Sequence, residues 1–211
     1  MDLAVYAVDV GSVSQQKLGW ARAYGPHGRV DANAEETDIR RLVDELETDI
    51  RNNRPVALGF ECPLYVPVPA DPQRLGKARV GEGNRAWSAG AGTGALATGL
   101  VEAAWVLRAL RERVAHVRVS VDWAEFQQKA GGLFLWEAFV SAAGKGTSLT
   151  HHGDAAIAVE RFFELLPNPT TADTVDAEAP LSLIGAAALW AGVLDDPGAL
   201  RGKCLVVKAA A

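Results

Sequence analysis

The sequence predicts a single α/β domain over residues 1–211, built on a mixed five-stranded sheet with helices on both faces. Short apolar segments rich in β-branched residues alternate along the chain with segments of helical periodicity, which is typical of α/β folds. The chain of 211 residues has the length of one sizeable domain. No internal repeat or interdomain linker divides it. The elements along the chain are therefore expected to form one sheet with its covering helices.

Two strands are expected to open the chain as an antiparallel hairpin. Residues 3–10 are apolar and place Asp9 near the C-terminal end of a buried strand, and residues 17–24 alternate between apolar and polar positions. The segment between them is short, which favours a hairpin. Residues 25–28 (GPHG) predict a turn, and residues 29–32 are expected to begin a third strand.

A helix and another buried strand follow. Residues 35–52 carry acidic residues at their start, as the helix dipole favours, and one apolar stripe with spacings of three and four: Ile39, Leu42, Val43, Leu46 and Ile50. Residues 55–60 predict a short buried strand that ends at Glu61. Pro63 prevents this strand from continuing regularly.

An irregular insertion is expected at about residues 64–96. This region is rich in proline and glycine, and so long a connection inside a compact domain is usually functional or mobile. A helix is predicted over residues 96–114, and strands over residues 117–121 and 133–140. Glu137 lies near the end of the last of these strands.

The last third of the chain predicts two helices and a closing strand. Residues 154–166 form the first helix, with Asp154 as its expected N-cap. Residues 181–194 are rich in alanine and predict a buried helix. Residues 204–208 are expected to form the closing strand.

Composition excludes several classes of protein. The formal net charge is −5, which argues against indiscriminate binding of nucleic acid, so contact with a polyanion has to be local. No apolar run reaches the roughly 18 residues of a membrane helix, and the first residues do not lead us to expect a secretory signal. Cys62 and Cys204 make neither a disulfide framework nor a zinc site. We expect a cytoplasmic protein without a membrane partner.

Carboxylates follow the expected strands and open the late helix. Asp9 and Glu61 come at the ends of two buried strands, and Asp176 precedes the alanine-rich helix. Strand ends in α/β sheets converge on one edge, where ligands commonly bind. Carboxylates gathered there repel one another unless a cation neutralises them, and Mg²⁺ or Mn²⁺ suits such oxygen ligands. The alternative for each acid is a plain helix cap or a turn.

The order of these elements resembles the ribonuclease H-like superfamily. The resemblance rests on residues 4–12 (AVYAVDVGS), on residues 59–64 (GFECPL), and on the late acid before residues 183–189 (LIGAAAL). More narrowly, the chain looks like an uncharacterised predicted-nuclease branch of that superfamily. In that branch an acid and a Pro-Leu step follow an apolar strand and precede an Arg-containing loop.

The resemblance implies a five-stranded mixed sheet and a divalent-metal site. Asp9 would be the first ligand, Glu61 the second and Asp176 the third. The late helix of the family often carries its acid inside the first turn, whereas Pro180 delays the helix here. Asp173 and Glu178 therefore stay open as alternatives to Asp176. Glu137 is a further candidate ligand, because the family has an acid in a similar apolar setting.

Several other side chains are weaker candidates. Residues 67–85 carry four cations against Asp71 and Glu82. Three of these cations, together with Lys129, are candidates to contact substrate phosphates, with a plain surface role as the alternative: Arg74, Arg79 and Arg85. His151 and His152 precede a helix, where one of them could polarise a water.

Three further motifs are weak. Cys62 could be a nucleophile, although no base or oxyanion donor is evident beside it. The glycine-rich residues 90–94 follow no strand, and residues 144–147 (GKGT) lack the spacing of a nucleotide-triphosphatase loop. Trp87, in the glycine-rich region, could stack on a base, while most of the six tryptophans are expected in the core.

These observations lead to three functional hypotheses. The first is a metal-dependent nuclease that hydrolyses phosphodiesters of nucleic acid. The second is an actin-like phosphotransfer relative, because residues 9–12 (DVGS) resemble the first phosphate loop of that superfamily. The third is a non-catalytic binding protein of the same fold. The identity of the substrate and the oligomeric state, including a homo-oligomer, stay open.

Overall fold

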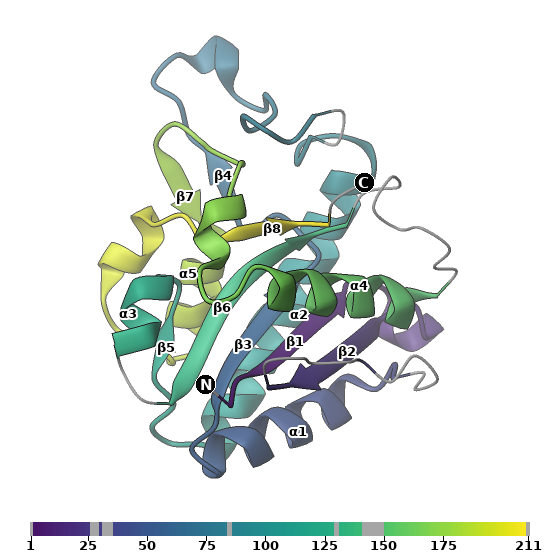
Figure 1. Cartoon of the computed structure of the whole chain (residues 1–211). Coiled ribbons are helices and arrows are strands. Elements are labelled where there is room, and N and C mark those ends of the chain that lie inside the picture. Colours follow the sequence, from purple (N-terminus) through teal and green to yellow (C-terminus); the bar gives the residue numbers. More distant parts are fainter. Residues whose placement is uncertain are drawn as a thin grey trace.

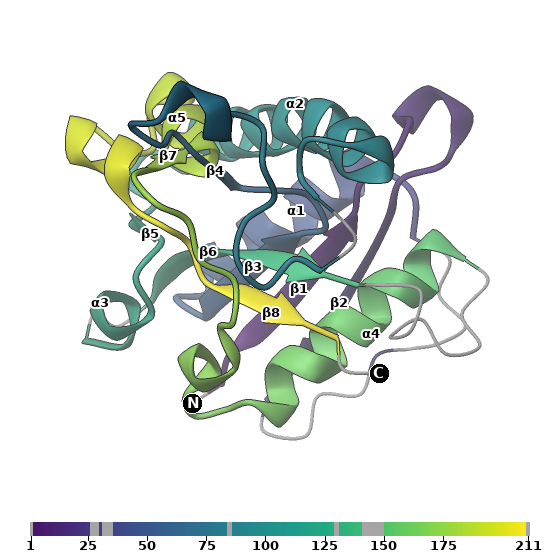
Figure 2. The same ribbon diagram turned by 90° about the horizontal axis from the view of Figure 1, so that it is seen from above.

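The computed structural model of the chain describes residues 2–25, 30, 36–83, 86–128, 131–140 and 150–209. It confirms an α/β architecture, with a mixed sheet between two helical layers (Figures 1 and 2). The described part of the sheet has six strands rather than the predicted five, and the predicted closing strand is one of them. The predicted strand at 29–32 lies outside the described residues except for Val30, as does the predicted turn except for Gly25.

The sheet has parallel strands at its centre and one antiparallel strand at its edge. The order is β2-β1-β3-β6-β5, and β8 pairs with the C-terminal end of β6. Among the described strands of this sheet, only the β1–β2 hairpin is antiparallel, and the other pairings are parallel. The strands are β1 (Ala4–Asp9), β2 (Gly19–Tyr24), β3 (Pro55–Phe60), β5 (Val119–Ser120), β6 (Gly132–Phe139) and β8 (Val206–Lys208). The C-terminal ends of β1, β3 and β6 therefore meet at one edge.

Two hydrophobic cores lie on the two faces of the sheet. Side chains alternate between faces along a strand. Tyr6 and Val8 of β1 therefore pack with the helices of one layer, and Val5 and Ala7 pack with those of the other. Figure 2 shows the first layer, with α1 (Ile39–Arg51), α2 (Gly90–Arg113) and α5 (Leu183–Trp190), and the second, with α3 (Trp123–Gln128) and α4 (His151–Glu164).

Four helices begin at other residues than predicted, among them α5, which starts at Leu183 instead of residue 181. Asp38 caps α1, so this helix starts at Ile39. Thr150 caps α4 by accepting from the Gly153 N–H, and Asp154 lies inside the first turn instead of at the N-cap. The glycine-rich residues 90–94 belong to α2, which has 24 residues. In the described part of the chain, no helix combines the length and the apolar character needed to cross a bilayer.

The predicted irregular insertion is partly ordered by pairing with distant residues. Strand β4 (Tyr65–Pro67) pairs with β7 (Pro180–Ser182) in a small antiparallel sheet. Val80 forms a single bridge with Asp176. Residues 68–79, which connect β4 to this bridge, extend beyond the main sheet at the top of Figure 1. These pairings hold the segment close to the edge where the central strands end.

Candidate metal centre

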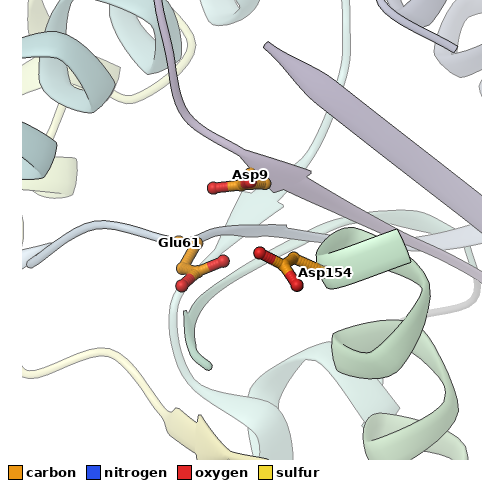
Figure 3. Close-up of side chains that lie close together, drawn as sticks. All are labelled: Asp9, Glu61 and Asp154. Carbon is orange, nitrogen blue, oxygen red and sulfur yellow. The ribbon is translucent and has the colours of Figure 1, made fainter. Parts of the chain in front are cut away.

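Three carboxylates from three separate elements converge at the C-terminal edge of the sheet. Asp9 ends β1, Glu61 directly follows β3, and Asp154 lies in the first turn of α4 (Figure 3). Each contributes one oxygen to a set in which all atoms lie within 4.8 Å of one another. Asp9 and Asp154 are 8% and 5% exposed. We call these three residues the carboxylate cluster.

The strands place Asp9 and Glu61 on the same face. Val8 and Phe60 are register partners in the parallel β1–β3 pair, and both point into the core under α1 and α2. The next residue of each strand therefore points to the opposite face, which α4 covers. The Glu61 N–H also donates to the Val8 carbonyl at 2.7 Å, so the ladder extends one residue beyond β3. Strand pairing alone thus brings these two acids together.

Glycine lets α4 approach this pair. Gly19 is the register partner of Asp9, and a Cβ at Gly19 would collide with the backbone of His151 and His152. His152 is buried, and its Nδ1–H donates to the Trp20 carbonyl at 2.8 Å. The first turn of α4 is thereby fixed against β2, with Asp154 near the positive end of the helix dipole, which favours an anion there.

His151 extends the cluster toward solvent. Its Nδ1 lies 2.5 Å from Asp9 Oδ2, and its side chain is 46% exposed. The neighbouring His152 points to β2, so the two histidines take different directions. His151 is therefore the one that lies at the candidate metal centre, in contact both with a carboxylate and with solvent.

The donor set fits a hard divalent cation. The oxygens around Mg²⁺ lie about 2.1 Å from the ion and hence roughly 3–4 Å from one another, a spacing compatible with the cluster. A bound cation would also offset the repulsion between converging carboxylates. The three acids can therefore hold Mg²⁺ or Mn²⁺ while leaving room for waters.

A cavity of about 210 Å³ lies beside the cluster. Asp9 and Glu61 line one side, and the first turns of α2 line another through Ala91, Gly92 and Ala95. The end of β6, from Glu137 to Val140, completes the wall. The small residues of α2 leave backbone close to the cavity. A substrate group can therefore approach the acids from this side.

A fourth acid, Glu102 on α2, lies behind the end of β1. It is 7% exposed, and the backbone N–H of Gly11 donates to its carboxylate. Burial, together with the negative charge of Asp9, raises the pKa of Glu102 to about 7. Glu102 thus feels the charge of the carboxylate cluster although it lies on the α2 side of the sheet.

Asp176, the predicted third ligand, lies elsewhere. Its Oδ1 accepts from Lys203 Nζ at 2.7 Å, and this ion pair lowers its pKa. Its side chain is 64% exposed. Of the two alternatives, Glu178 pairs with Arg74, and Asp173 is half-buried with a pKa raised by burial. Among the described residues, the third acid that the structure brings to Asp9 and Glu61 is Asp154.

Glu137 and Arg79 pair with each other in the interior. Trp136 and Ala138 of β6 point to the α4 face of the sheet. Glu137 lies between them in the strand, so its side chain points to the opposite face, toward α2. Arg79 reaches it from the insertion through Nη1 at 2.8 Å and Nη2 at 2.5 Å. Arg79 Nε also donates to Glu82 Oε1 at 2.9 Å. We call Arg79, Glu82 and Glu137 the arginine cluster.

Two predicted site residues, Arg79 and Glu137, form buried ion pairs in the arginine cluster. The side chains of Arg79, Glu82 and Glu137 are at most 1% exposed. Glu137 accepts in addition from the Leu64 N–H. The guanidinium of Arg79 is therefore used inside the protein and is not presented to a phosphate, and Glu137 binds a cation that the chain itself supplies.

The other candidate cations and Cys62 are placed as follows. Arg74 is half-exposed beside Glu178. Arg85, Lys129 and the rejected loop at 144–147 lie outside the described residues. Cys62 is buried, and burial raises the pKa of its thiol well above the usual value. A thiol that stays protonated is a poor nucleophile, which argues against that role.

Sequence reasoning missed Asp154 as a member of the carboxylate cluster and Glu102 as the buried acid behind the end of β1. The available signal for Asp154 was the resemblance, which implies an acid inside the first turn of a late helix. We looked for this acid before residues 183–189, whereas the structure has it in α4. Comparison of the chain with protein-family models, curated proteins and solved structures finds no match.

Proposed function

We propose that the chain is a phosphodiesterase dependent on Mg²⁺ or Mn²⁺ that cleaves nucleic acid, with Asp9, Glu61 and Asp154 as the metal ligands. The observation that carries this proposal is the convergence of three carboxylate oxygens within 4.8 Å at the edge where the central strands end. Asp9 ends β1, Glu61 follows β3 and Asp154 lies in α4, so their convergence depends on the packing of α4 against the sheet. This arrangement replaces Asp176 by Asp154 in the ligand set expected from the sequence.

The proposed reaction is attack of water on phosphorus, with cleavage of one P–O ester bond. A bound divalent cation lowers the pKa of a ligated water and offsets charge on the phosphate. Asp9, Glu61 and Asp154 hold and orient the site from rigid elements. His151 contacts Asp9 and is half-exposed, so it can pass the proton from the attacking water to solvent or to the leaving oxygen.

The order of strands also supports the family resemblance. An antiparallel hairpin followed by parallel strands, with the first acid at the end of β1, is the arrangement expected of a ribonuclease H-like domain. The resemblance stays part of the proposal. The geometry of the carboxylate cluster supports a cation site whether or not that resemblance holds.

The test compares two single substitutions, Asp154→Asn and Asp176→Asn. We expect the wild type to cleave single-stranded or double-stranded DNA or RNA with Mg²⁺ or Mn²⁺ and not with EDTA. Asp154→Asn should reduce cleavage by about 100-fold or more, because one ligand is lost. Asp176→Asn should stay within about two-fold, because its partner is Lys203 on the surface.

Calorimetric titration with Mn²⁺ gives an independent measurement. The wild type and Asp176→Asn should bind the ion, whereas Asp154→Asn should bind it at least about ten-fold more weakly. Loss of cleavage in Asp176→Asn together with full activity in Asp154→Asn would return the third ligand to Asp176. A folded wild type that binds Mn²⁺ and cleaves no nucleic acid would favour a non-catalytic binding protein.

A further inference from the structure

A second cavity, of about 340 Å³, opens between the start of α1, the middle of α2 and the β1–β2 loop. Its walls are mainly apolar and come from Val13, Ile39, Val101 and Trp105. Three of these side chains are unusually exposed for their type: Val13 at 42%, Val101 at 69% and Trp105 at 41%. Apolar surface of this kind, gathered at a cavity, is typical of a binding site.

One buried polar group borders this cavity. Glu102 lines it and is 7% exposed. One side of its carboxylate accepts from the Gly11 N–H, while Oε2 is buried and has no hydrogen-bond partner among the described residues. A buried oxygen without a partner is costly, so a ligand that donates to it would gain from the contact. The cavity thus combines apolar walls with a lining residue whose buried oxygen lacks a donor.

Trp105 and Glu102 lie close together on α2. The indole of Trp105 presents a large flat surface, and Val101 lies one helical turn before it. A flat aromatic ring with a polar edge matches both features, because it can stack on the indole and donate to the carboxylate. The lining also holds one anion and one cation at the start of α1, Asp38 and Arg40.

The end of β1 links the cavity to the carboxylate cluster through Glu102. Gly11, which donates to Glu102, follows Asp9 by two residues. The charge of Asp9 also contributes to the raised pKa of Glu102. A nucleic acid strand that crosses the edge of the sheet can therefore place a phosphate at the carboxylate cluster and a neighbouring base in the cavity.

We propose that this cavity is a nucleobase subsite, in which a base of the substrate strand stacks on Trp105 and donates an amino N–H to Glu102 Oε2. The subsite rests on the proposed nuclease function and specifies its substrate. Adenine, guanine and cytosine carry an amino group, whereas thymine and uracil do not. The subsite should therefore favour bases of the first group, as carboxylates do when they accept from cytosine.

The test is a cycle between a protein substitution and removal of a base. Single-stranded oligonucleotides of cytosine are made with one abasic nucleotide at each position in turn. Trp105→Ala should lower kcat/KM on the intact strand by about ten-fold. On the strand whose abasic nucleotide falls in the subsite, Trp105→Ala should have no further effect. Trp190→Ala is the matched control, because Trp190 is 62% exposed and lies over Arg108 instead.

Glu102→Gln tests the polar contact. Above about pH 8, where the Glu102 carboxyl group is ionised and only accepts, the wild type should cleave the cytosine strand faster than a thymine strand, and the variant should reduce this preference, since its amide also donates. Equal kcat/KM for wild type and Trp105→Ala on every strand, in an enzyme that is active with Mg²⁺, would overturn the subsite and leave the nuclease proposal standing.

A second measurement separates the subsite from the activity. If the wild type cleaves no nucleic acid, the nuclease proposal fails, and the cavity is then tested by binding alone. Cytidine should quench the tryptophan fluorescence of the wild type, and most of this quenching should be lost in Trp105→Phe and kept in Trp190→Phe. Absence of quenching in the wild type, or equal quenching in both variants, would overturn the subsite as well.

Discussion

Two groups of buried charges lie at the same edge of the sheet, and they are built on opposite principles. In the arginine cluster, Glu82 and Glu137 point at a guanidinium that the chain supplies, and all three side chains are almost fully buried. In the carboxylate cluster, three acids point at one another. The first group pairs its acids with a guanidinium, whereas the second gathers like charges beside His151, an arrangement that a divalent cation stabilises.

The difference follows from the faces of the strands. Asp9 and Glu61 come from strands in register and share the α4 face, whereas Glu137 is on the other face of β6. Moving an acid by one position along its strand turns its side chain to the other face of the sheet. This difference therefore decides whether the acid joins the cation site or an internal ion pair. Acids at the ends of adjacent strands are thus not equivalent, even when all three line one cavity.

The largest expected effect is on the arginine cluster. Arg79→Met should leave Glu82 and Glu137 buried without their cation, and this should lower the free energy of unfolding by about 3–5 kcal/mol. Urea denaturation measures the change. Arg74→Met, which removes a half-exposed partner of Glu178, is the control and should cost less than about 1 kcal/mol. Equal losses in both variants would show that the buried ion pairs carry no special weight.

The sequence was sufficient for most elements and for two of the three acids of the carboxylate cluster. The apolar stripe of residues 39–50 predicted α1, and the apolar runs that end at Asp9 and Glu61 predicted β1 and β3. These signals are local and depend on periodicity alone. Pairing of parallel strands then brings the two acids together without further information.

Local pattern was not sufficient for the third acid. Thr150 and Asp154 are both good N-cap residues, and a shift of four residues decides whether Asp154 caps the helix or lies inside its first turn. The role of Arg79 depended on a loop that folds back onto β6, which no local pattern reveals. Tertiary contacts therefore decided which charged residues belong to the site.

A smaller effect on the free energy of unfolding is expected from Glu102, a buried acid that belongs to neither cluster. Its pKa is about 7 in the folded protein against an ordinary value near 4.5. Between these values the folded state keeps a proton that the unfolded state has lost, so Glu102 lowers the free energy of unfolding as the pH rises through this window. The accumulated loss is up to about 3 kcal/mol.

Glu102→Gln removes this ionisation. Stability curves of the wild type and the variant should diverge between about pH 4.5 and 7 in favour of the variant, and should run parallel above that window. Urea midpoints across the pH range measure the difference. A constant offset between the two proteins at all pH values would mean that the charge of Asp9 and the burial of Glu102 have no effect on its ionisation.

The smallest expected change in stability concerns the approach of α4 to β2, on which the carboxylate cluster depends and the arginine cluster does not. Gly19→Ala places a methyl group against the backbone of His151 and His152. The helix must shift, which should cost about 1–3 kcal/mol and move Asp154 away from Asp9. Mn²⁺ affinity, measured by calorimetry, should fall by about ten-fold or more, because the ligands no longer converge.

Gly94→Ala is the matched control, since a Cβ at Gly94 on α2 meets nothing within 4 Å. Alanine favours a helix over glycine by up to about 1 kcal/mol, so this variant should be as stable as the wild type or slightly more so, with unchanged Mn²⁺ affinity. The arginine cluster should be intact in both variants, because its contacts come from β6 and the insertion. If Gly19→Ala binds Mn²⁺ as tightly as the wild type, the close contact between α4 and β2 does not build the cation site, and Asp154 loses its place as the third ligand.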